Sequence, residues 1–403
     1  MKHVIVVGGG PSGIMAAYSA AMQGHKVTLF EKNKQMGKKL LMTGNGRCNV
    51  TNRCDIQAFL TKVNHNPKFL YSALNSFNSE DLLKLLQRYQ CPTKEEDHGR
   101  MFPVSNKAMD VLYSFGEMLH EKGVEIHCEE PVISLLVDEG TCIGIKTIKA
   151  DYKADVIIVC TGGNSFPNTG STGDGYVMAR RIGHTITPLF PSLVSLEVRE
   201  DFIKDLQGLV LKDVCITIPK LKKKAFTGDV LCTHYGISGP IILNLSGLLD
   251  FDKNKEYIFR LDLMKDKSIE ELDDYLIHLF SKNPNKKISN VLMEVFPKRL
   301  VPILLKQLHI NEHIYVHSVK KEERKKIVET VKNLEITITS TRSFEEAMIT
   351  KGGISCKEIN PNTMESKKIQ NLRFAGEILD VDACTGGYNL QIAWSTGYLA
   401  GKI

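Results

Sequence analysis

The sequence predicts an α/β fold: a Rossmann-like nucleotide-binding domain, interrupted by an antiparallel β domain that itself carries a small helical insert. Three observations predict it. A strand, a glycine-rich turn and a helix follow one another within the first 31 residues. Near residue 190 the pattern changes to strict alternation of apolar and polar residues, and from residue 268 it becomes helical. The last thirty residues are again Gly-rich and apolar, so we expect the chain to return to its first domain.

The first domain begins with a βαβ unit. Val4–Val7 is an apolar run stopped by glycine, which is typical of a buried parallel strand, and Lys26–Phe30 is expected to be its neighbour. An Ala-rich helix from Pro11 to about Gly24 joins them. After a Gly/Lys-rich loop we expect two amphipathic helical stretches and a small β meander that leads back into the sheet. These segments are 67–89, 107–122, 132–137, 142–148 and 156–160.

The inserted part has two sequence patterns, one typical of strands and one typical of helices. Alternation in 194–199, 214–218 and 257–263 indicates antiparallel strands with one wet face. A capping box, Ser268-x-x-Glu271, then opens a helical stretch, and 336–339 returns to strand. Three prolines divide the helical stretch into short helices: Pro284, Pro297 and Pro302. The expected domains are 1–190 plus 341–403 for the nucleotide-binding domain, 191–264 plus 335–340 for the β domain, and 265–334 for the helical domain.

Composition narrows the class of protein. The 403 residues are too many for one ordinary domain of roughly 100–200 residues. Hydrophobic residues make up 42% and charged residues 24%, the balance of a globular protein with a large core. No apolar run approaches the roughly 20 residues that span a bilayer, and the N-terminus lacks the cleavage site of a signal peptide. We therefore expect a cytoplasmic protein with no membrane contact.

The net charge of +6 comes partly from lysine-rich runs. One run is Lys220–Lys224 and the other is Lys320–Lys326. Glu322 and Glu323 interrupt the second run, which favours a solvated helix face. Binding to a polyanion is the alternative, and charge alone does not choose between them.

A Gly-x-Gly-x-x-Gly motif lies between the first strand and the first helix. Gly8 permits a tight turn, Gly10 lets the backbone approach a pyrophosphate, and Gly13 lets helix and strand pack closely. The phosphates would then meet the helix N-terminus, where free N–H groups and the helix dipole favour negative charge. Glu31, which ends the second strand, is placed to accept hydrogen bonds from ribose hydroxyls. A purely structural glycine turn is the alternative, but the context favours dinucleotide binding.

The C-terminus favours FAD over NAD. Phe374–Asp380 predicts a short strand followed by a glycine and carboxylates, and Thr385–Gln391 opens a helix that runs to Leu399. Such a turn would aim helix N–H groups at N1 and O2 of a flavin, where negative charge accumulates on reduction. Glu377 or Asp380 would hold ribityl hydroxyls. An ordinary packing helix with a glycine start is the alternative; a plain nicotinamide dehydrogenase has no need of this second element.

Two further stretches are assigned to the cofactor. Cys160–Gly163 closes a β segment and resembles the Ala-Thr-Gly-Gly element of two-dinucleotide flavoproteins. In the loop Gly37–Asn52, glycines and asparagines permit positive φ, so N–H groups could form an anion nest beside Lys39 and Arg47; a surface hairpin is the alternative. The residues expected to contact the cofactor are Gly8, Gly10, Pro11, Ser12, Gly13, Glu31, Lys32, Lys39, Thr43, Gly44, Arg47, Cys48, Val132, Thr161, Gly162, Gly163, Gly376, Glu377, Asp380, Gly387, Tyr388, Asn389, Leu390 and Gln391.

Together, Gly37–Asn52, Thr233–Pro240 and Gly376–Gly397 resemble the BaiN/RdsA-type flavoproteins. That group includes an aminoacetone oxidase, a bile-acid-pathway enone reductase and a ribosomal RNA dihydrouridine synthase. The resemblance covers essentially the whole chain. It implies an FAD domain of the glutathione-reductase-like type, split by a β-barrel-like domain and a helical domain. It leaves the activity open, because these relatives differ in substrate.

Three side chains are candidate proton donors. If the inserted domain covers the flavin, His234 or Tyr235 could donate a proton beside the hydride acceptor, although a structural turn before a strand explains them equally well. Cys48 is the third candidate, although a lone cysteine usually serves packing. The linker 341–354 is expected at the flavin edge.

Cysteine usage excludes two classes of site. The ten cysteines contain no Cys-x-x-Cys and no Cys/His cluster with zinc spacing, so we expect no metal. The missing thiol pair also argues against a flavin disulfide reductase. No second Gly-x-Gly-x-x-Gly follows a strand, so NAD(P)H would bind transiently at the flavin face, or another reductant or O₂ would serve.

The resemblance, together with the modestly basic charge, makes reduction of a polarised C=C bond the leading functional hypothesis, with uridine of large-subunit ribosomal RNA as the leading specific substrate. The competitors are an amine or aminoketone oxidase that uses O₂, a small-molecule enone reductase, and a non-catalytic flavin-binding or tRNA-modification accessory protein. The sequence leaves the electron donor open, and it allows a monomer or a homodimer.

Overall fold

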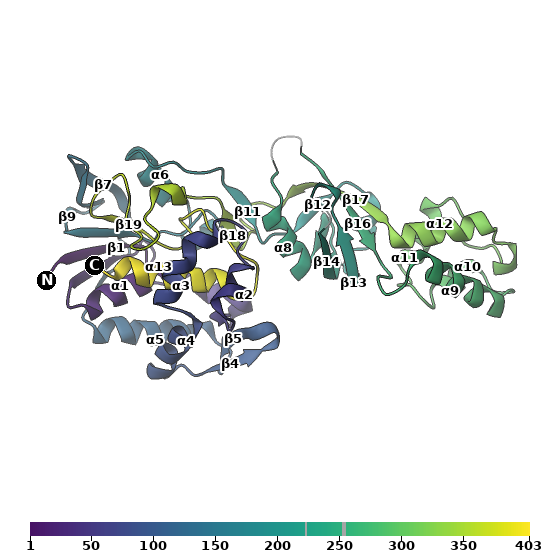
Figure 1. The fold of residues 1–403 in the computed structure, drawn as a ribbon, viewed down its shortest axis with the longest axis horizontal. Coiled ribbons are helices and arrows are strands. Elements are labelled where there is room, and N and C mark those ends of the chain that lie inside the picture. Colours follow the sequence, from purple (N-terminus) through teal and green to yellow (C-terminus); the bar gives the residue numbers. More distant parts are fainter. Residues whose placement is uncertain (222–223, 252–254) are drawn as a thin grey trace. The chain divides into compact units, whose positions relative to one another are not determined.

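The computed structural model describes residues 1–221, 224–251 and 255–403. It divides into two compact units (Figure 1): unit 1 is Met1–Leu193 with Ser343–Ile403, and unit 2 is Val194–Arg342. Of the lysine-rich run noted above, Lys222 and Lys223 lie outside the described residues. The finer division into three domains stays a prediction.

The core of unit 1 is a parallel sheet with strand order β19-β10-β1-β2-β6. Its central strands are short and mostly apolar, and all four side chains of β10 are buried. The last strand of the chain, β19, pairs with β10, so the C-terminal segment completes the N-terminal sheet. The strands are β1 (His3–Val7), β2 (Lys26–Phe30), β6 (Glu125–His127), β10 (Val156–Val159) and β19 (Leu372–Phe374).

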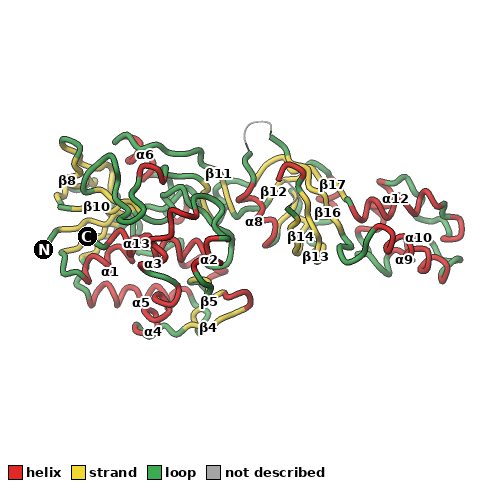
Figure 2. Tube along the Cα trace, in the orientation of Figure 1, coloured by secondary structure: helices red, strands yellow, loops and turns green. Residues whose placement is uncertain are grey.

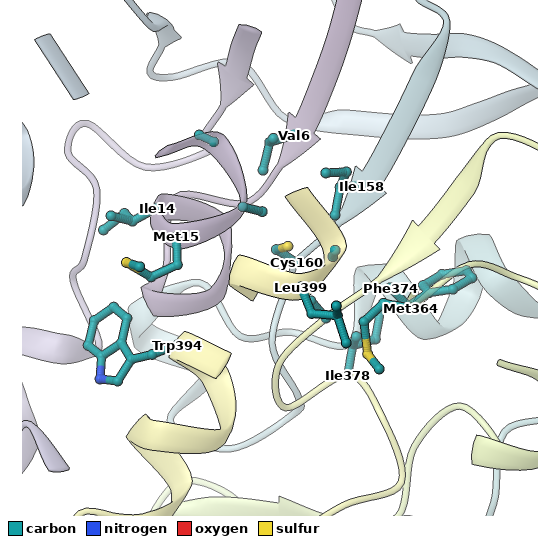
Figure 3. Packing of buried hydrophobic residues seen from close by; sticks show 14 of the residues in the cluster. Val6, Ile14, Met15, Ile158, Cys160, Met364, Phe374, Ile378, Trp394 and Leu399 are labelled. Atoms are coloured by element: carbon teal, nitrogen blue, oxygen red, sulfur yellow. The ribbon is translucent and has the colours of Figure 1, made fainter. Parts of the chain in front are cut away.

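Two helices, α1 (Pro11–Met22) and α13 (Tyr388–Gly401), run side by side against this sheet (Figures 1 and 2). Small residues allow their backbones to approach closely: a Cβ on Gly397 would lie 2.2 Å from the carbonyl oxygen of Ser12. Figure 3 shows the apolar packing between them, in which Trp394 of α13 lies near Met15 of α1. The indole Nε1 of Trp394 donates to the carbonyl of Val50 at 3.0 Å, so this large ring has no unsatisfied donor.

An antiparallel meander packs against the sheet. It comprises β7 (Val132–Asp138), β8 (Thr141–Thr147) and β9 (Asp151–Lys153). The ring of Tyr152 meets that of Phe30 at 4.8 Å between centroids. The other elements of unit 1 are β3 (Thr51–Asn52), α2 (Ile56–Leu60), α3 (Tyr71–Ser76), α4 (Ser79–Arg88), β4 (Thr93–Glu96), β5 (Arg100–Pro103), α5 (Ala108–Glu121), α6 (Asp174–Arg181), β11 (Phe190–Ser192) and β18 (Ile349–Lys351), with a 3-10 helix η1 (Leu40–Gly46).

The predicted helical stretch 67–89 consists of separate helices. It contains a 3-10 turn and α3, which end before Phe77, and then α4. The break is local: the side chain of Asn78 accepts from the backbone N–H of Glu80 at 2.9 Å and of Asp81 at 3.2 Å, which caps a new helix. Apolar periodicity continues across such a cap and does not reveal it.

Unit 2 contains a closed antiparallel barrel in the order β12-β15-β14-β13-β16-β17. The alternating sequence produces it: in β16, Tyr257, Phe259 and Leu261 are buried while Ile258 and Arg260 face solvent. The predicted α/β fold with an inserted β-barrel is confirmed. The strands are β12 (Leu196–Val198), β13 (Val210–Thr217), β14 (Ala225–Cys232), β15 (Gly236–Ser238), β16 (Tyr257–Asp262) and β17 (Leu334–Thr341).

Between β16 and β17 the chain forms short helices that share a core with the barrel. The first begins at the predicted capping box, where Ser268 Oγ accepts from the Glu271 N–H at 3.1 Å and Glu271 Oε2 accepts from the Ser268 N–H at 2.7 Å. These helices are α9 (Ile269–Lys282), α10 (Ile288–Leu292), α11 (Leu300–Gln307) and α12 (Lys321–Lys332); α7 (Asp201–Asp205) and α8 (Pro240–Leu248) flank the barrel strands. Among the described residues, no helix has the length and apolar character to cross a bilayer.

Candidate active site

Strand register aligns several chain ends at one edge of the sheet. Val7 pairs with Phe30 and with Val159, and Val159 pairs with Phe374. The segments that follow β1, β2, β10 and β19 therefore leave the sheet at the same level. In open α/β sheets ligands bind at this carboxyl edge. Most of the predicted cofactor residues lie on these segments.

The glycine-rich turn after β1 is sterically constrained. Gly8 has φ +104°, and a Cβ there would lie 2.6 Å from the carbonyl oxygen of Cys160. A Cβ on Gly13 would lie 1.8 Å from the carbonyl oxygen of Gly8, so any side chain would push α1 away from β1. A Cβ on Gly10, in contrast, would meet no described atom within 4 Å. The open space at Gly10 is what a phosphate resting on the helix end requires.

Two helix N-termini in the predicted cofactor segments have no side-chain cap. In the described chain, α1 begins after Gly10, with Pro11 and Ser12 in its first turn, and α13 begins after Gly387, both without a capping side-chain hydrogen bond. Each end therefore offers backbone N–H groups to an anion or to an electron-rich ring edge. These two helix ends fit two parts of FAD. The start of α1 would hold the pyrophosphate, and the start of α13 would face the flavin ring.

Unsatisfied polar atoms lie in two of the predicted segments. Thr161 Oγ1, after β10, and Asn49 Oδ1, in the loop after η1, are buried and have no hydrogen-bond partner among the described residues. Buried polar groups are usually satisfied, so these atoms are compatible with a bound ligand or water, and four further atoms of this kind lie outside the predicted segments, in His25, Tyr89, Ser114 and Ser192. Gly162 follows with φ +73°, and Gly163 packs against Thr350 and Glu377. The residues present thus fit a bound dinucleotide.

Glu31 is buried at the end of β2. Its carboxylate accepts from the Gly9 N–H at 2.8 Å, and from the N–H and the Nδ2 of Asn33 at 2.8 and 2.7 Å. The residue holds the glycine turn in place and retains capacity for one further donor, such as a ribose hydroxyl. The neighbouring Lys32 points elsewhere and forms an ion pair with Asp174.

Lys39 and Glu377 bond to each other. The lysine Nζ lies 2.8 Å from Glu377 Oε2, and each side chain is about one-fifth exposed. Glu377 also accepts from Ser165 Oγ at 2.8 Å and from the Thr350 N–H at 2.9 Å. The predicted phosphate-binding lysine and the predicted ribityl-binding carboxylate therefore form one network that ties four segments together.

The loop 37–52 adopts the positive φ angles that its composition permits. Gly44, Asn45 and Gly46 have φ of 56°, 56° and 80°. Arg47 leaves this turn to pair with Glu96 at 2.6 Å, and its guanidinium lies 4.0 Å from the centroid of the Phe102 ring. Thr43 Oγ1 donates to the carbonyl of Leu40 at 2.7 Å. In the structure, then, Arg47 and Thr43 both have protein partners.

Cys48 is fully buried in the same loop. Burial raises the pKa of its thiol to about 12. A group of this acidity, sealed from solvent, is a poor proton donor at neutral pH. Its burial and its raised pKa therefore favour a packing role for Cys48 over a catalytic one.

The start of α13 is held by its own side chains. Asn389 accepts from the Ala383 N–H at 2.9 Å and donates to the Ala383 carbonyl at 2.8 Å, which closes the preceding loop. Gln391 is buried and accepts from Thr51 Oγ1 at 2.6 Å. Both side chains form hydrogen bonds within the protein, so these two residues would contact a cofactor through their backbone groups.

The remaining predicted contacts are more scattered. Burial raises the pKa of the Asp380 carboxyl, with the nearby carboxylate of Asp382 acting in the same direction. Tyr388 packs edge-on against Phe59 at 5.2 Å, and Leu390 is partly buried against the core. Gly376 closes against Ser12, with a hypothetical Cβ 2.4 Å from its Oγ. Val132 is the half-buried first residue of β7.

His234 and Tyr235 lie in unit 2, in the turn between β14 and β15. Their rings meet edge-on at 4.7 Å, and the Arg342 guanidinium lies 4.5 Å from the centroid of the Tyr235 ring. His234 is exposed and Tyr235 half-buried. The pair is therefore accessible to a substrate, whereas Cys48 is not.

A histidine–aspartate pair in unit 1 was missed by sequence reasoning. The His65 Nδ1 hydrogen-bonds the carboxylate of Asp382, whose side chain is 1% exposed, and Asn64 Nδ2 donates to its other oxygen at 2.8 Å. The pair fastens the segment after α2 to the loop that precedes α13. No local spacing could have predicted it, because the two residues are 317 positions apart.

We expect His65→Ala to destabilise unit 1 by about 1–3 kcal/mol, since a buried carboxylate loses a hydrogen-bond partner. Urea unfolding followed by tryptophan fluorescence measures this, because Trp394 is the one tryptophan and lies in the core of unit 1. The exposed His120 of α5 supplies a matched control, His120→Ala, which should leave the midpoint unchanged. Equal midpoints for both variants would contradict a structural role for the pair.

The model of the HI0933-like protein Rossmann domain matches residues 2–403. The chain belongs to the HI0933-like family. The matched range includes residues of both units.

Two curated relatives span nearly the whole chain. A 3-dehydro-bile acid delta(4,6)-reductase of Clostridium scindens is 32% identical, covering 100% of this chain and 98% of its own length. A ribosomal RNA dihydrouridine synthase of Haemophilus influenzae is 30% identical, covering 98% of this chain and 96% of its own length. Among solved structures, 3-ketosteroid-delta4-(5alpha)-dehydrogenase of Rhodococcus jostii shares the fold with a TM-score of 0.51 at 14% identity, covering 100% of this chain and 96% of that one. This HI0933-like protein is an FAD-dependent oxidoreductase.

Proposed function

We propose that this HI0933-like protein reduces a polarised C=C bond with electrons from NAD(P)H, and that its substrate is a uridine of large-subunit ribosomal RNA. The observation that carries the proposal is the carboxyl edge of the sheet, where the uncapped start of α1 and the open space at Gly10 fit the phosphates of a dinucleotide. The relatives support the reaction class: a delta(4,6)-reductase and a dihydrouridine synthase both add hydrogen across a C=C bond.

The chemistry of uridine defines what the chain must do. The C5=C6 bond is conjugated to the C4 carbonyl, so a hydride adds at C6 and a proton at C5. Bound FAD would supply the hydride, which it first takes from NAD(P)H. The protein must present the base outside its stack, because a stacked base cannot reach a flavin. It must also provide the proton.

For the proton we propose Tyr235 or His234 rather than Cys48. The first two belong to an accessible turn, whereas Cys48 is buried with its pKa raised to about 12. Tyr235→Phe or His234→Gln should lower turnover about 10²–10⁴-fold for the residue that donates the proton. Flavin reduction by NAD(P)H should be unchanged in that variant. Cys48→Ala should retain both half-reactions; loss of turnover with intact FAD in Cys48→Ala would return the role to the cysteine.

The substrate is tested in cells. Ribosomal RNA from a strain that lacks the gene should lose dihydrouridine at one position, and the wild-type gene should restore it; retention of all dihydrouridine would rule this substrate out. The similarity to the bile acid reductase favours a second candidate, reduction of a small enone. That candidate predicts rapid NAD(P)H-dependent turnover of steroid-like enones by the purified protein, with no change in ribosomal RNA.

A further inference from the structure

The positive charge of the chain is concentrated in one segment. Residues 282–321, within the helical part of unit 2, contain eight Lys or Arg and two Glu. The net charge of this segment therefore equals the +6 of the whole chain. The rest of the sequence is balanced in total although it includes the run Lys220–Lys224, so this segment is one place where attraction for a polyanion is expected to act.

Two stretches of this segment pair with each other. The Ile288 N–H donates to the Ile314 carbonyl at 2.9 Å, and the Val316 N–H donates to the Lys286 carbonyl at 3.0 Å. Lys287 and Tyr315 are opposed in the resulting antiparallel bridge. Opposed residues of such a bridge project to the same face, and His317, two residues along, projects to it as well.

The opposite face of this pairing is apolar. Ile288 and Val316 are buried in the core of unit 2, whereas Lys287, Tyr315 and His317 are exposed. We call these three exposed residues the Tyr315 platform. The fold thus needs the buried face for stability, and the platform is free to serve another purpose.

The platform has an ordered aromatic surface. The rings of Tyr315 and His317 are stacked, with centroids 5.8 Å apart and planes inclined by 8°. His317 Nδ1 bonds the Pro284 carbonyl at 2.9 Å, which fixes its ring, and Tyr315 remains 51% exposed. Exposed aromatic rings beside lysines are the elements with which proteins hold unpaired nucleotides: bases stack on the rings while phosphates meet the cations.

We propose that the Tyr315 platform binds single-stranded RNA. The choice of RNA rests on the proposed function; the platform itself rests on the charge and the stacked rings. Lys282 and Lys320 flank the two paired stretches in sequence and are exposed, so a strand crossing the platform would find further cations on either side. The site would bind the RNA and would take no part in the chemistry.

Binding is measured by fluorescence anisotropy, with the full-length FAD-loaded protein and a short labelled uridine-rich RNA at two salt concentrations. Tyr315→Ala should weaken binding about tenfold, since a stacked base is lost, and Tyr315→Phe should bind as wild type. Lys287→Glu should weaken binding and lower the dependence of affinity on salt. Two variants of exposed residues in unit 1, Tyr113→Ala and Lys146→Glu, serve as matched controls and should bind as wild type.

Polyphosphate, which has charge but no bases, separates stacking from simple attraction. Tyr315→Ala should bind it as wild type does, whereas Lys287→Glu should bind it less tightly. Unchanged RNA affinity in Tyr315→Ala and Lys287→Glu would overturn the platform, and so would an equal loss of polyphosphate and RNA in Tyr315→Ala. The same loss of affinity for anionic phospholipid vesicles as for RNA in Tyr315→Ala would also overturn it.

This test and that of the proposed function fail separately. If the platform variants lose RNA affinity but the deletion strain keeps its dihydrouridine, RNA binding at the platform is supported and the rRNA substrate is ruled out. If the deletion strain loses dihydrouridine but the variants bind RNA normally, the substrate stands and the platform falls.

Discussion

Gly13→Ala is expected to abolish FAD binding and to destabilise unit 1 by about 3 kcal/mol or more. The added Cβ would lie 1.8 Å from the carbonyl oxygen of Gly8, so α1 must move away from β1. Both the glycine turn and the helix end depend on that contact. Flavin content after purification and a thermal melt of the protein measure the two effects.

Gly10→Ala separates cofactor binding from folding. Its Cβ meets no described atom within 4 Å, and Gly10 has φ −81° and ψ −176°, which alanine adopts freely. The variant should fold within about 1 kcal/mol of wild type and lose at least about tenfold in FAD affinity. Gly116→Ala, inside α5 and equally free of clashes, should keep FAD and gain up to about 1 kcal/mol. Wild-type FAD affinity in Gly10→Ala would show that the phosphates do not rest on α1.

Glu377→Ala is expected to cost about 3 kcal/mol and most of the FAD affinity. The carboxylate accepts from Lys39, Ser165 and the Thr350 N–H, so its removal leaves a largely buried ammonium without its countercharge and the Thr350 N–H without this acceptor. Urea unfolding measures the loss. The double variant with Lys39→Met should recover part of it, because the unpaired charge is then gone.

The control for this ion pair is one exposed to solvent. Glu335 and Arg260 lie 2.8 Å apart in the barrel, and both side chains are about half exposed. Glu335→Ala should therefore cost less than about 1 kcal/mol. A similar cost for Glu377→Ala, or additive effects of Glu377→Ala and Lys39→Met, would contradict the network described here.

The sequence predicted what is encoded locally. The glycine motif was enough to predict the tight turn between β1 and α1, because a Cβ on Gly8 or Gly13 would collide with backbone atoms. Alternation of apolar and polar residues in 257–263 and 336–339 was enough to predict barrel strands, since successive side chains of a strand point to opposite faces of the sheet.

What the sequence could not predict depends on contacts between distant segments. The His65–Asp382 and Lys39–Glu377 pairs join residues 317 and 338 positions apart, and nothing in their spacing relates them. The expectation that Lys39 faces an anion was reasonable for a lysine beside glycines. The folded chain instead supplies a carboxylate as its partner, and only the return of the C-terminal segment to the sheet brings that group within reach.

The most direct test of the account is anaerobic reduction of the purified yellow protein by NADH and by NADPH, followed by addition of uridine-containing ribosomal RNA fragments. If the protein is an FAD-dependent RNA reductase, one of the nicotinamides should bleach the flavin rapidly and the RNA should reoxidise it. One dihydrouridine should form per flavin reoxidised. A flavin that nicotinamide leaves oxidised, but that an amine bleaches and air restores with release of peroxide, would contradict the account and identify an oxidase.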